Sequence, residues 1–273
     1  NGNLDTNKSD GDNVFAANLK ATSFLENNWE MRLEGKYADQ ETFMRRYEFD
    51  NETSYKSFID LQKISNNSIS NIEIYNIKNL EETNVKNEPT LAPSISHHIF
   101  NSNQKYNYDI KLKAHSIQND EGYDIMRWSG LGIINKKFNF NSFLIDTDAN
   151  IGLDLYSIQG RPFSDKNESR YIDRISSGFS VAASNQYGVT NNGSELVLEP
   201  KIQISSFFSP DRTAQVPNRD SSEFILDQNN LFFNNQYQGR DNLQRNDRLN
   251  FGVTSMLMSD KVGEINFFVG QSQ

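Results

Sequence analysis

Metal-ligating residue types recur in the run from Asp146 to Asp154, which reads Asp-Thr-Asp-Ala-Asn-Ile-Gly-Leu-Asp. Oxygen-bearing side chains at alternate positions resemble the first part of a calcium loop. An EF-hand loop needs Gly at its sixth position and Glu at its twelfth, whereas this chain has Ile151 and Ser157 there. A turn between two antiparallel strands explains the same residues, so we predict no metal site.

Catalysis by a His side chain has little support in the sequence. The chain has three His residues, His97, His98 and His115, and no Cys. His97 and His98 are adjacent, and neighbouring side chains of a strand point to opposite faces, so they make a poor metal pair. A Ser–His hydrolase stays a formal alternative, because a triad is recognised by its geometry, but no Ser-containing run suggests an activated nucleophile. We therefore predict no catalytic residue and no cofactor.

The elements that must position any site are indicated by a strict alternation of apolar and polar residues, clearest in 106–115. Successive side chains of a strand point to opposite faces, so the two residue classes separate onto the two faces of one strand. The apolar face carries Tyr106, Tyr108, Ile110, Leu112 and Ala114, and the polar face carries Asn107, Asp109, Lys111, Lys113 and His115. Repeated runs of roughly ten residues with polar loops between them are typical of a transmembrane β-barrel.

The composition favours the same class. The 273 residues carry a net charge of −9, with 36% hydrophobic residues and a mean hydropathy of −0.72. Such apolar content is thin for a soluble chain of this length, whereas a barrel needs only one apolar face. An aromatic content of 12% argues against disorder. The acidic balance gives no support to nucleic-acid binding, which needs clustered basic residues.

These patterns predict an all-β protein, an antiparallel meander of the transmembrane β-barrel type. We expect residues 1–28 to form a polar N-terminal loop or strand remnant, and residues 29–273 to form a partial outer-membrane β-barrel of about 12–14 strands. Residues 209–245 are expected to form a long loop with one strand-like piece at its centre. The predicted strands are 29–37, 42–49, 55–64, 70–80, 94–100, 106–117, 123–134, 138–146, 149–158, 171–183, 196–208, 249–258 and 264–271.

Several cationic side chains fall in the polar phase of these strands. In a barrel they would line a hydrophilic lumen through which sugars and phosphates pass. They are equally explained as ordinary wetted side chains on one face of a sheet. The lumen-facing candidates are Lys111, Lys113, His115, Arg127 and Lys201.

Several separated motifs, in a fixed order between residues 29 and 272, add a more specific signal. They are 39–47, 88–93, 122–127, 198–200, 216–221, 227–232, 239–241, 248–252 and 269–272. This ordered set resembles the C-terminal barrel domain of the LptD family of outer-membrane lipopolysaccharide-assembly proteins, also called organic solvent tolerance proteins. The chain departs from the family pattern at Arg219, where the family usually has Glu, and at Asn242, where it usually has Arg.

The resemblance implies a barrel with about twice as many strands, preceded by a periplasmic jellyroll domain, so we expect this chain to be an internal slice of the barrel. It implies transport and assembly of lipopolysaccharide at the outer membrane of a Gram-negative bacterium, without chemistry. The implied partners are lipopolysaccharide, the plug lipoprotein LptE inside the barrel, and the periplasmic bridge protein LptA, bound through a jellyroll domain that we expect to lie outside this chain.

The segments 216–221 and 239–241 carry motifs that strand periodicity does not explain, and we predict that together they form a functional loop. Its candidate residues are Pro217, Asn218, Asp220, Ser221, Gly239 and Asp241. Two other classes of protein remain open at this point. A general porin-like barrel would pair its own first and last strands, and a soluble β-sandwich that binds carbohydrate would pack its apolar faces together.

Overall fold

The structure is a computed structural model, and it describes residues 15–38, 54–79, 89–102, 106–119, 123–160, 168–191, 193–210, 215–218, 220–261 and 263–273. The chain divides into two compact units. The first comprises Asn1–His97, Lys113–Arg127 and Ser157–Arg170, and the second comprises His98–Leu112, Trp128–Tyr156 and Tyr171–Gln273. The predicted strand 42–49 lies outside the described residues.

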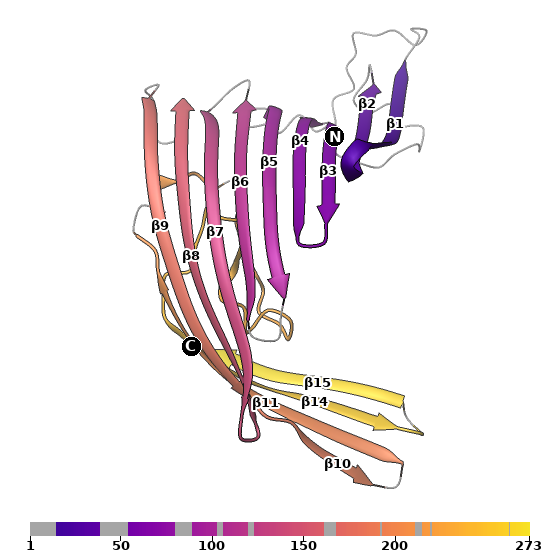
Figure 1. Cartoon of the computed structure of the whole chain (residues 1–273), viewed down its shortest axis with the longest axis vertical. Helices are drawn as coiled ribbons and strands as arrows, with labels where there is room; N and C mark the ends of the chain where they lie inside the picture. The colour runs from indigo at the N-terminus through magenta and orange to yellow at the C-terminus, as the bar shows by residue number, and fades with distance from the viewer. Residues whose placement is uncertain are drawn as a thin grey trace, which may run out of the picture. The chain divides into compact units, whose positions relative to one another are not determined.

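Nearly all described secondary structure is β-strand, and thirteen strands form one antiparallel meander (Figure 1). Their order is β1-β2-β3-β4-β5-β6-β7-β8-β9-β11-β14-β15, with β10 paired to β11, which confirms the predicted fold class and strand number. The strands are β1 (Ala16–Leu25), β2 (Trp29–Ala38), β3 (Ser54–Ser65), β4 (Ser68–Asn79), β5 (Pro89–Ser102), β6 (Asn107–Asn119), β7 (Tyr123–Phe140), β8 (Phe143–Gly160), β9 (Glu168–Ser184), β10 (Tyr187–Asn191), β11 (Ser194–Phe208), β14 (Arg248–Ser259) and β15 (Gly263–Ser272). Among the described residues, no helix combines the length and the apolar content that a membrane crossing requires.

The first unit is built from hairpins of neighbouring strands. Strand β1 lies within the polar segment 1–28 and pairs with β2 from Ala16 opposite Ala38 to Leu25 opposite Trp29. The intervening turn contains Asn27 at a φ of 58°, a left-handed conformation that Asn tolerates better than most residues. An ion pair joins two neighbouring strands of this unit: Arg32 of β2 donates through Nε to the buried carboxylate of Asp60 on β3 at 2.9 Å.

The turn that the sequence analysis expected near residue 147 does not exist. Residues 143–160 form one strand of 18 residues, β8, and the turn to β7 lies at Asn141 and Ser142, where Asn141 has a φ of 54°. Asp146 and Asp148 occupy alternate positions of β8, so they continue the polar phase of a strand. Carboxylates spaced along an extended strand do not wrap around one ion, which removes the resemblance to a calcium loop.

The second unit has an inverted distribution of polar and apolar side chains. On β9, β11 and β14, one face is predominantly polar and buried, for example Asn250 at 0% exposure, and the other is apolar and exposed, for example Ile204 at 63%. The buried polar residues include Arg174, Ser176, Ser180, Ser184, Gln203, Ser205, Arg248 and Asn250, and the exposed apolar residues include Ile175, Phe179, Val181, Ile202, Ile204, Leu249, Phe251 and Val253. A soluble protein would show the opposite pattern. Strands with lipid on one face and a polar interior on the other show this one.

The outward apolar face can be tested with an Ile202→Arg substitution in the intact protein. We expect a loss of about 2–4 kcal/mol of stability, because an Arg on the lipid face must enter the hydrocarbon region. The free energy of unfolding in lipid vesicles measures this loss, and Ile202→Met serves as a control of similar volume. Equal stability of the two variants would show that this face does not meet lipid.

Candidate functional site

The segment between β11 and β14, of which residues 209–210, 215–218 and 220–247 are described, folds back in these parts onto the buried polar face of the second unit (Figure 1). We call this segment the β11–β14 connection. It contains two short strands that pair with each other, β12 (Ser222–Glu223) and β13 (Tyr237–Gln238), rather than the single central strand that was expected. Side chains from β8 and β9 bind the connection through ion pairs and hydrogen bonds.

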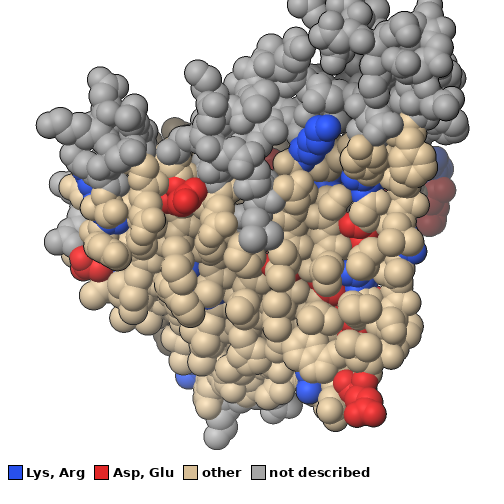
Figure 2. Space-filling model, turned by 90° about the horizontal axis from the view of Figure 1, so that it is seen from above, with Lys and Arg blue, Asp and Glu red and all other residues tan. Residues whose placement is uncertain are grey.

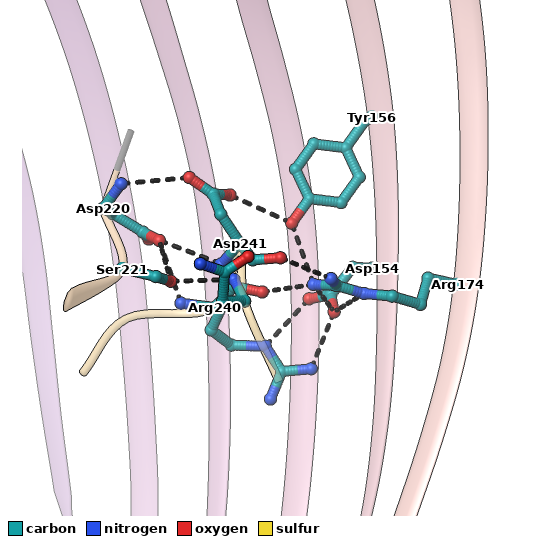
Figure 3. A network of polar contacts seen from close by, with 8 residues as sticks. Asp154, Tyr156, Arg174, Asp220, Ser221, Arg240 and Asp241 are labelled. Carbon is teal, nitrogen blue, oxygen red and sulfur yellow. Dashed lines mark hydrogen bonds and ion pairs between the residues drawn. The ribbon is translucent and has the colours of Figure 1, made fainter. Parts of the chain in front are cut away.

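The centre of this contact is the carboxylate of Asp154 on β8, which is shared by two Arg side chains (Figure 3). Arg174 of β9 donates to Oδ2 through Nη2 at 2.8 Å and through Nε at 3.2 Å. Arg240 of the connection donates through Nε to Oδ1 at 2.9 Å and through Nη2 to Oδ2 at 2.8 Å. The side chains of Asp154 and Arg174 are 0% exposed, so the ion pairs are shielded from solvent.

A second set of hydrogen bonds ties Arg174 to the backbone of the connection. Its Nη1 donates to the carbonyl of Asp241 at 2.7 Å, and its Nη2 donates to the carbonyl of Arg240. Tyr156 donates from its hydroxyl to Oδ1 of Asp241 at 3.1 Å and accepts from Arg174 at 3.0 Å. The wall of β8 and β9 therefore holds the backbone of 240–241 as well as a side chain.

Within the connection, Asp220 joins the two motifs that the sequence analysis singled out. Its Oδ1 accepts from the backbone N–H groups of Arg240 at 2.9 Å and of Asp241 at 3.0 Å, and from the hydroxyl of Ser221 at 3.0 Å. The backbone N–H of Asp220 donates to Oδ2 of Asp241 at 3.0 Å. The segments around residues 220 and 240 therefore form one hydrogen-bonded unit.

Two turns shape this unit. Asn218 Oδ1 accepts from the backbone N–H of Ser221 at 3.0 Å, a turn that Asn side chains commonly make. Gly239 has a φ of +83°, and a Cβ at this position would lie 2.1 Å from the carbonyl oxygen of Asp220. A Gly is therefore required for both the backbone angle and the close approach.

The structure brings together five of the six loop candidates through these contacts: Asn218, Asp220, Ser221, Gly239 and Asp241. The sixth, Pro217, is buried next to them in the sequence. Their functional role stays a prediction.

The lumen-facing candidates are not gathered at one place by the described contacts. Lys111 and Lys113 are exposed, His115 is half-buried, and Arg127 is 3% exposed. Lys201 lies on the same phase of β11 as the buried Gln203, and its Nζ stands 4.6 Å from the ring centre of Phe232 in the connection. That they face a lumen stays a prediction.

Four residues central to the contact were not among the predicted site residues: Asp154, Tyr156, Arg174 and Arg240. Asp154 ended the run that resembled a calcium loop, and Arg240 lay inside a recognised motif, so both had a sequence signal. For Tyr156 and Arg174, the only sequence signal was their position on the inward-facing phase of β8 and β9.

The described residues assemble neither a metal site nor a Ser-His-Asp triad. No group of three or more His, Asp or Glu side chains in the described part is placed to hold a metal ion. Ser70 Oγ lies 2.9 Å from Nδ1 of His97, and Asp109 Oδ1 lies 2.8 Å from Nε2 of His98. Because His97 and His98 point to opposite faces of β5, these are two separate pairs.

Charged residues on the face seen in Figure 2 are interspersed, with Lys and Arg close to Asp and Glu among uncharged side chains. At the site itself, one buried carboxylate is shared by two guanidinium groups. Such charge-assisted, bidentate contacts fix a segment in place.

The comparisons with known proteins identify the family. The model of a protein family described as LPS transport system D, LptD, matches residues 12–273. No curated protein matches the chain. Among solved structures, the β domain of the Bordetella autotransporter BrkA is similar at 9% identity, with 95% of this chain and 90% of that chain covered and a TM-score of 0.28, too low to support an argument about the fold. The LptD family comprises transport and assembly proteins of the outer membrane rather than enzymes. With nearly its whole length matched, the chain belongs to the LptD family, LPS transport system D.

Proposed function

We propose that this chain forms part of the wall of a barrel translocon that delivers lipopolysaccharide through a hydrophilic lumen to the surface of a Gram-negative bacterium. The observation that carries the proposal is the inverted side-chain distribution of β9, β11 and β14. Their exposed apolar face suits lipid, and their buried polar face suits an interior that accepts sugars. In this proposal Lys111, Lys113, His115, Arg127 and Lys201 contribute positive charge to the interior.

The physical task is to move an amphiphile whose sugars need water and whose acyl chains need lipid. A polar interior accommodates the sugars, and a lateral opening between the first and last strands of the whole barrel would let the acyl chains reach the bilayer. We further propose the plug lipoprotein LptE as a partner inside the barrel, and the periplasmic bridge protein LptA as a partner bound through a jellyroll domain. These details rest on the family and on the polar wall of the second unit.

Photo-crosslinking in cells tests whether lipopolysaccharide passes the polar face. A photoreactive amino acid at Lys201, which is half-buried on the polar phase of β11, is expected to form an adduct with lipopolysaccharide in transit. Its neighbour Ile202 is 48% exposed on the opposite face and is the matched control. Gel mobility and immunodetection of lipopolysaccharide measure both adducts before and after its delivery is blocked.

The two positions should respond differently to the block. The Lys201 adduct should disappear, because it requires lipopolysaccharide in transit, whereas any Ile202 adduct with lipid already in the outer leaflet should persist. Absence of an adduct at Lys201, combined with ion conductance through the reconstituted protein, would favour the porin-like alternative.

A further inference from the structure

Arg248 at the start of β14 is a buried cation to which the described residues offer no carboxylate. It is 6% exposed, and its Nη2 donates to the backbone carbonyls of Phe233 at 2.5 Å and Asn234 at 3.3 Å. Among the described residues its Nε and Nη1 find no hydrogen-bond partner, and its guanidinium carbon lies 5.9 Å from the ring centre of Phe207. Arg174 and Arg240 differ from it, because both pair with Asp154.

The neighbours of Arg248 on the same face also have unused hydrogen-bonding atoms. In the pairing of β11 with β14, Ser205 lies opposite Arg248, and Gln203 lies opposite Asn250. Positions two apart on a strand share a face, so these four side chains form one polar patch. In the described part of the chain, Ser205 Oγ and Asn250 Oδ1 have no hydrogen-bond partner, and Ser205 and Asn250 are 1% and 0% exposed.

This arrangement is unfavourable as it stands, and its chemistry indicates what would relieve it. A buried charge is costly unless an opposite charge or a full set of hydrogen bonds compensates it. The planar fork of a guanidinium group matches the oxygens of a phosphate or carboxylate, and a Ser hydroxyl can donate to the same group. An anion with several oxygen acceptors would accept hydrogen bonds from these donors and balance the charge of Arg248.

The cover of the patch is the stretch Phe232–Asn235 of the β11–β14 connection. Gln203 Nε2 donates to the carbonyl of Phe232 at 3.0 Å and to Oδ1 of Asn234 at 3.3 Å. Its Oε1 accepts from Nδ2 of Asn250 at 2.8 Å, which leaves Asn250 with an unpartnered acceptor. Movement of this cover would free both amides to turn, and Asn250 would then present its donor to an anion.

We propose that Arg248 and Ser205 form a binding site for a phosphate group, which exchanges with the carbonyls of Phe233 and Asn234 when the stretch Phe232–Asn235 lifts. The proposal rests on the proposed function, because lipopolysaccharide carries phosphate groups on its sugars. The connection stays attached at Asp154 through Arg240, and Leu231 is 3% exposed. Lifting Phe232–Asn235 requires that the hydrogen bonds of Arg248 and Gln203 to this stretch break, together with the one from Nδ2 of Asn234 to Oδ1 of Asp148.

Binding measurements on the intact protein in its native complex test the site. The probes are purified lipopolysaccharide, the same lipopolysaccharide after phosphatase treatment, and inorganic phosphate as a competitor. We expect the native protein to prefer the phosphorylated form by about tenfold or more, as a charge-assisted bidentate contact allows. Arg248→Gln should reduce the preference to about onefold, and Ser205→Ala should reduce it by a few-fold. Ser206→Ala is the matched control, since Ser206 lies on the opposite, exposed face, and it should keep the full preference.

A second measurement needs no variant and so does not depend on the folding of Arg248→Gln. Hydrogen exchange at Phe232–Asn235 of the native protein should accelerate on addition of phosphorylated lipopolysaccharide and stay unchanged with the treated form. Competition by inorganic phosphate would assign recognition to the phosphate itself, and a full preference without such competition would assign it to phosphate carried on the lipid.

The possible failures are distinguishable. Equal binding of the two lipopolysaccharide forms, or an unchanged preference in Arg248→Gln, would overturn the phosphate site and leave the proposed function standing. Absence of any lipopolysaccharide binding would overturn the proposed function itself.

Discussion

An Asp154→Asn variant of the intact protein is expected to lose about 3–5 kcal/mol of stability and to release the β11–β14 connection from β8 and β9. The substitution removes the charge that two guanidinium groups share, and Arg174, whose side chain is 0% exposed, is left buried without it. An unpaired buried charge costs far more than the pair contributes. Two measurements report the change: the temperature at which the folded form is lost on gels, and the rate of proteolysis within residues 215–245.

The matched control is Asp146→Asn on the same strand and the same phase. Asp146 accepts from Asn135 and lies 3.4 Å from Nζ of Lys137, whose side chain is 58% exposed, so the pair is screened by solvent. Loss of such a pair costs about 0–1 kcal/mol. If Asp154→Asn were as stable and as resistant to protease as Asp146→Asn, the ion pairs at Asp154 would not hold the connection.

A loose connection should also impair the barrier function of the envelope, because the polar wall of the second unit would lose its cover. Increased entry of large antibiotics into cells with Asp154→Asn, at protein levels equal to those of Asp146→Asn, would show this. Because the two variants are compared at equal protein levels, a difference in antibiotic entry reports the lost contact of the connection with β8 and β9 and not a lower amount of protein in the membrane.

The strand pattern of this fold is predictable because lipid and a polar interior impose opposite requirements on alternate residues. Strand β11 was predicted at 196–208 and spans Ser194–Phe208, and β14 was predicted at 249–258 and spans Arg248–Ser259. The prediction failed in β8, where Asp146 and Asp148 were interpreted as turn residues. In a strand with a wet inner face, consecutive polar positions of one phase look like a turn, since the same residue types suit both.

The site was predictable only where local motifs marked it. The segments 216–221 and 239–241 were singled out, and Asp220 Oδ1 does accept from the backbone of Arg240 and Asp241. Arg174 lies 66 residues before Arg240 in the sequence, and its partners depend on how the connection folds back. The sequence around a single inward-facing Arg does not indicate whether its side chain meets a carboxylate, as that of Arg174 does, or only backbone carbonyls, as that of Arg248 does.

Gly239→Ala is expected to disrupt the contact between the β11–β14 connection and strands β8 and β9 by a change within the connection. We expect a loss of about 2–5 kcal/mol of stability. A Cβ in the left-handed conformation at a φ of +83° is strained, and it would also lie 2.1 Å from the carbonyl oxygen of Asp220. Backbone cannot yield there without moving Asp220, whose carboxylate binds the N–H groups of Arg240 and Asp241. Proteolysis of residues 215–245 and the thermal loss of the folded form measure the effect.

Gly263→Ala isolates the two causes, because Gly263 has nearly the same φ, +85°, but nothing within 4 Å of an added Cβ. It should therefore show only the conformational cost, about 1–2 kcal/mol, and leave the connection resistant to protease. Equal losses in the two variants would mean that the close approach of Gly239 to Asp220 contributes nothing. A larger loss in Gly239→Ala, matched by the protease sensitivity of Asp154→Asn, would show that the motif turn and the buried ion pairs hold one and the same segment against the wall.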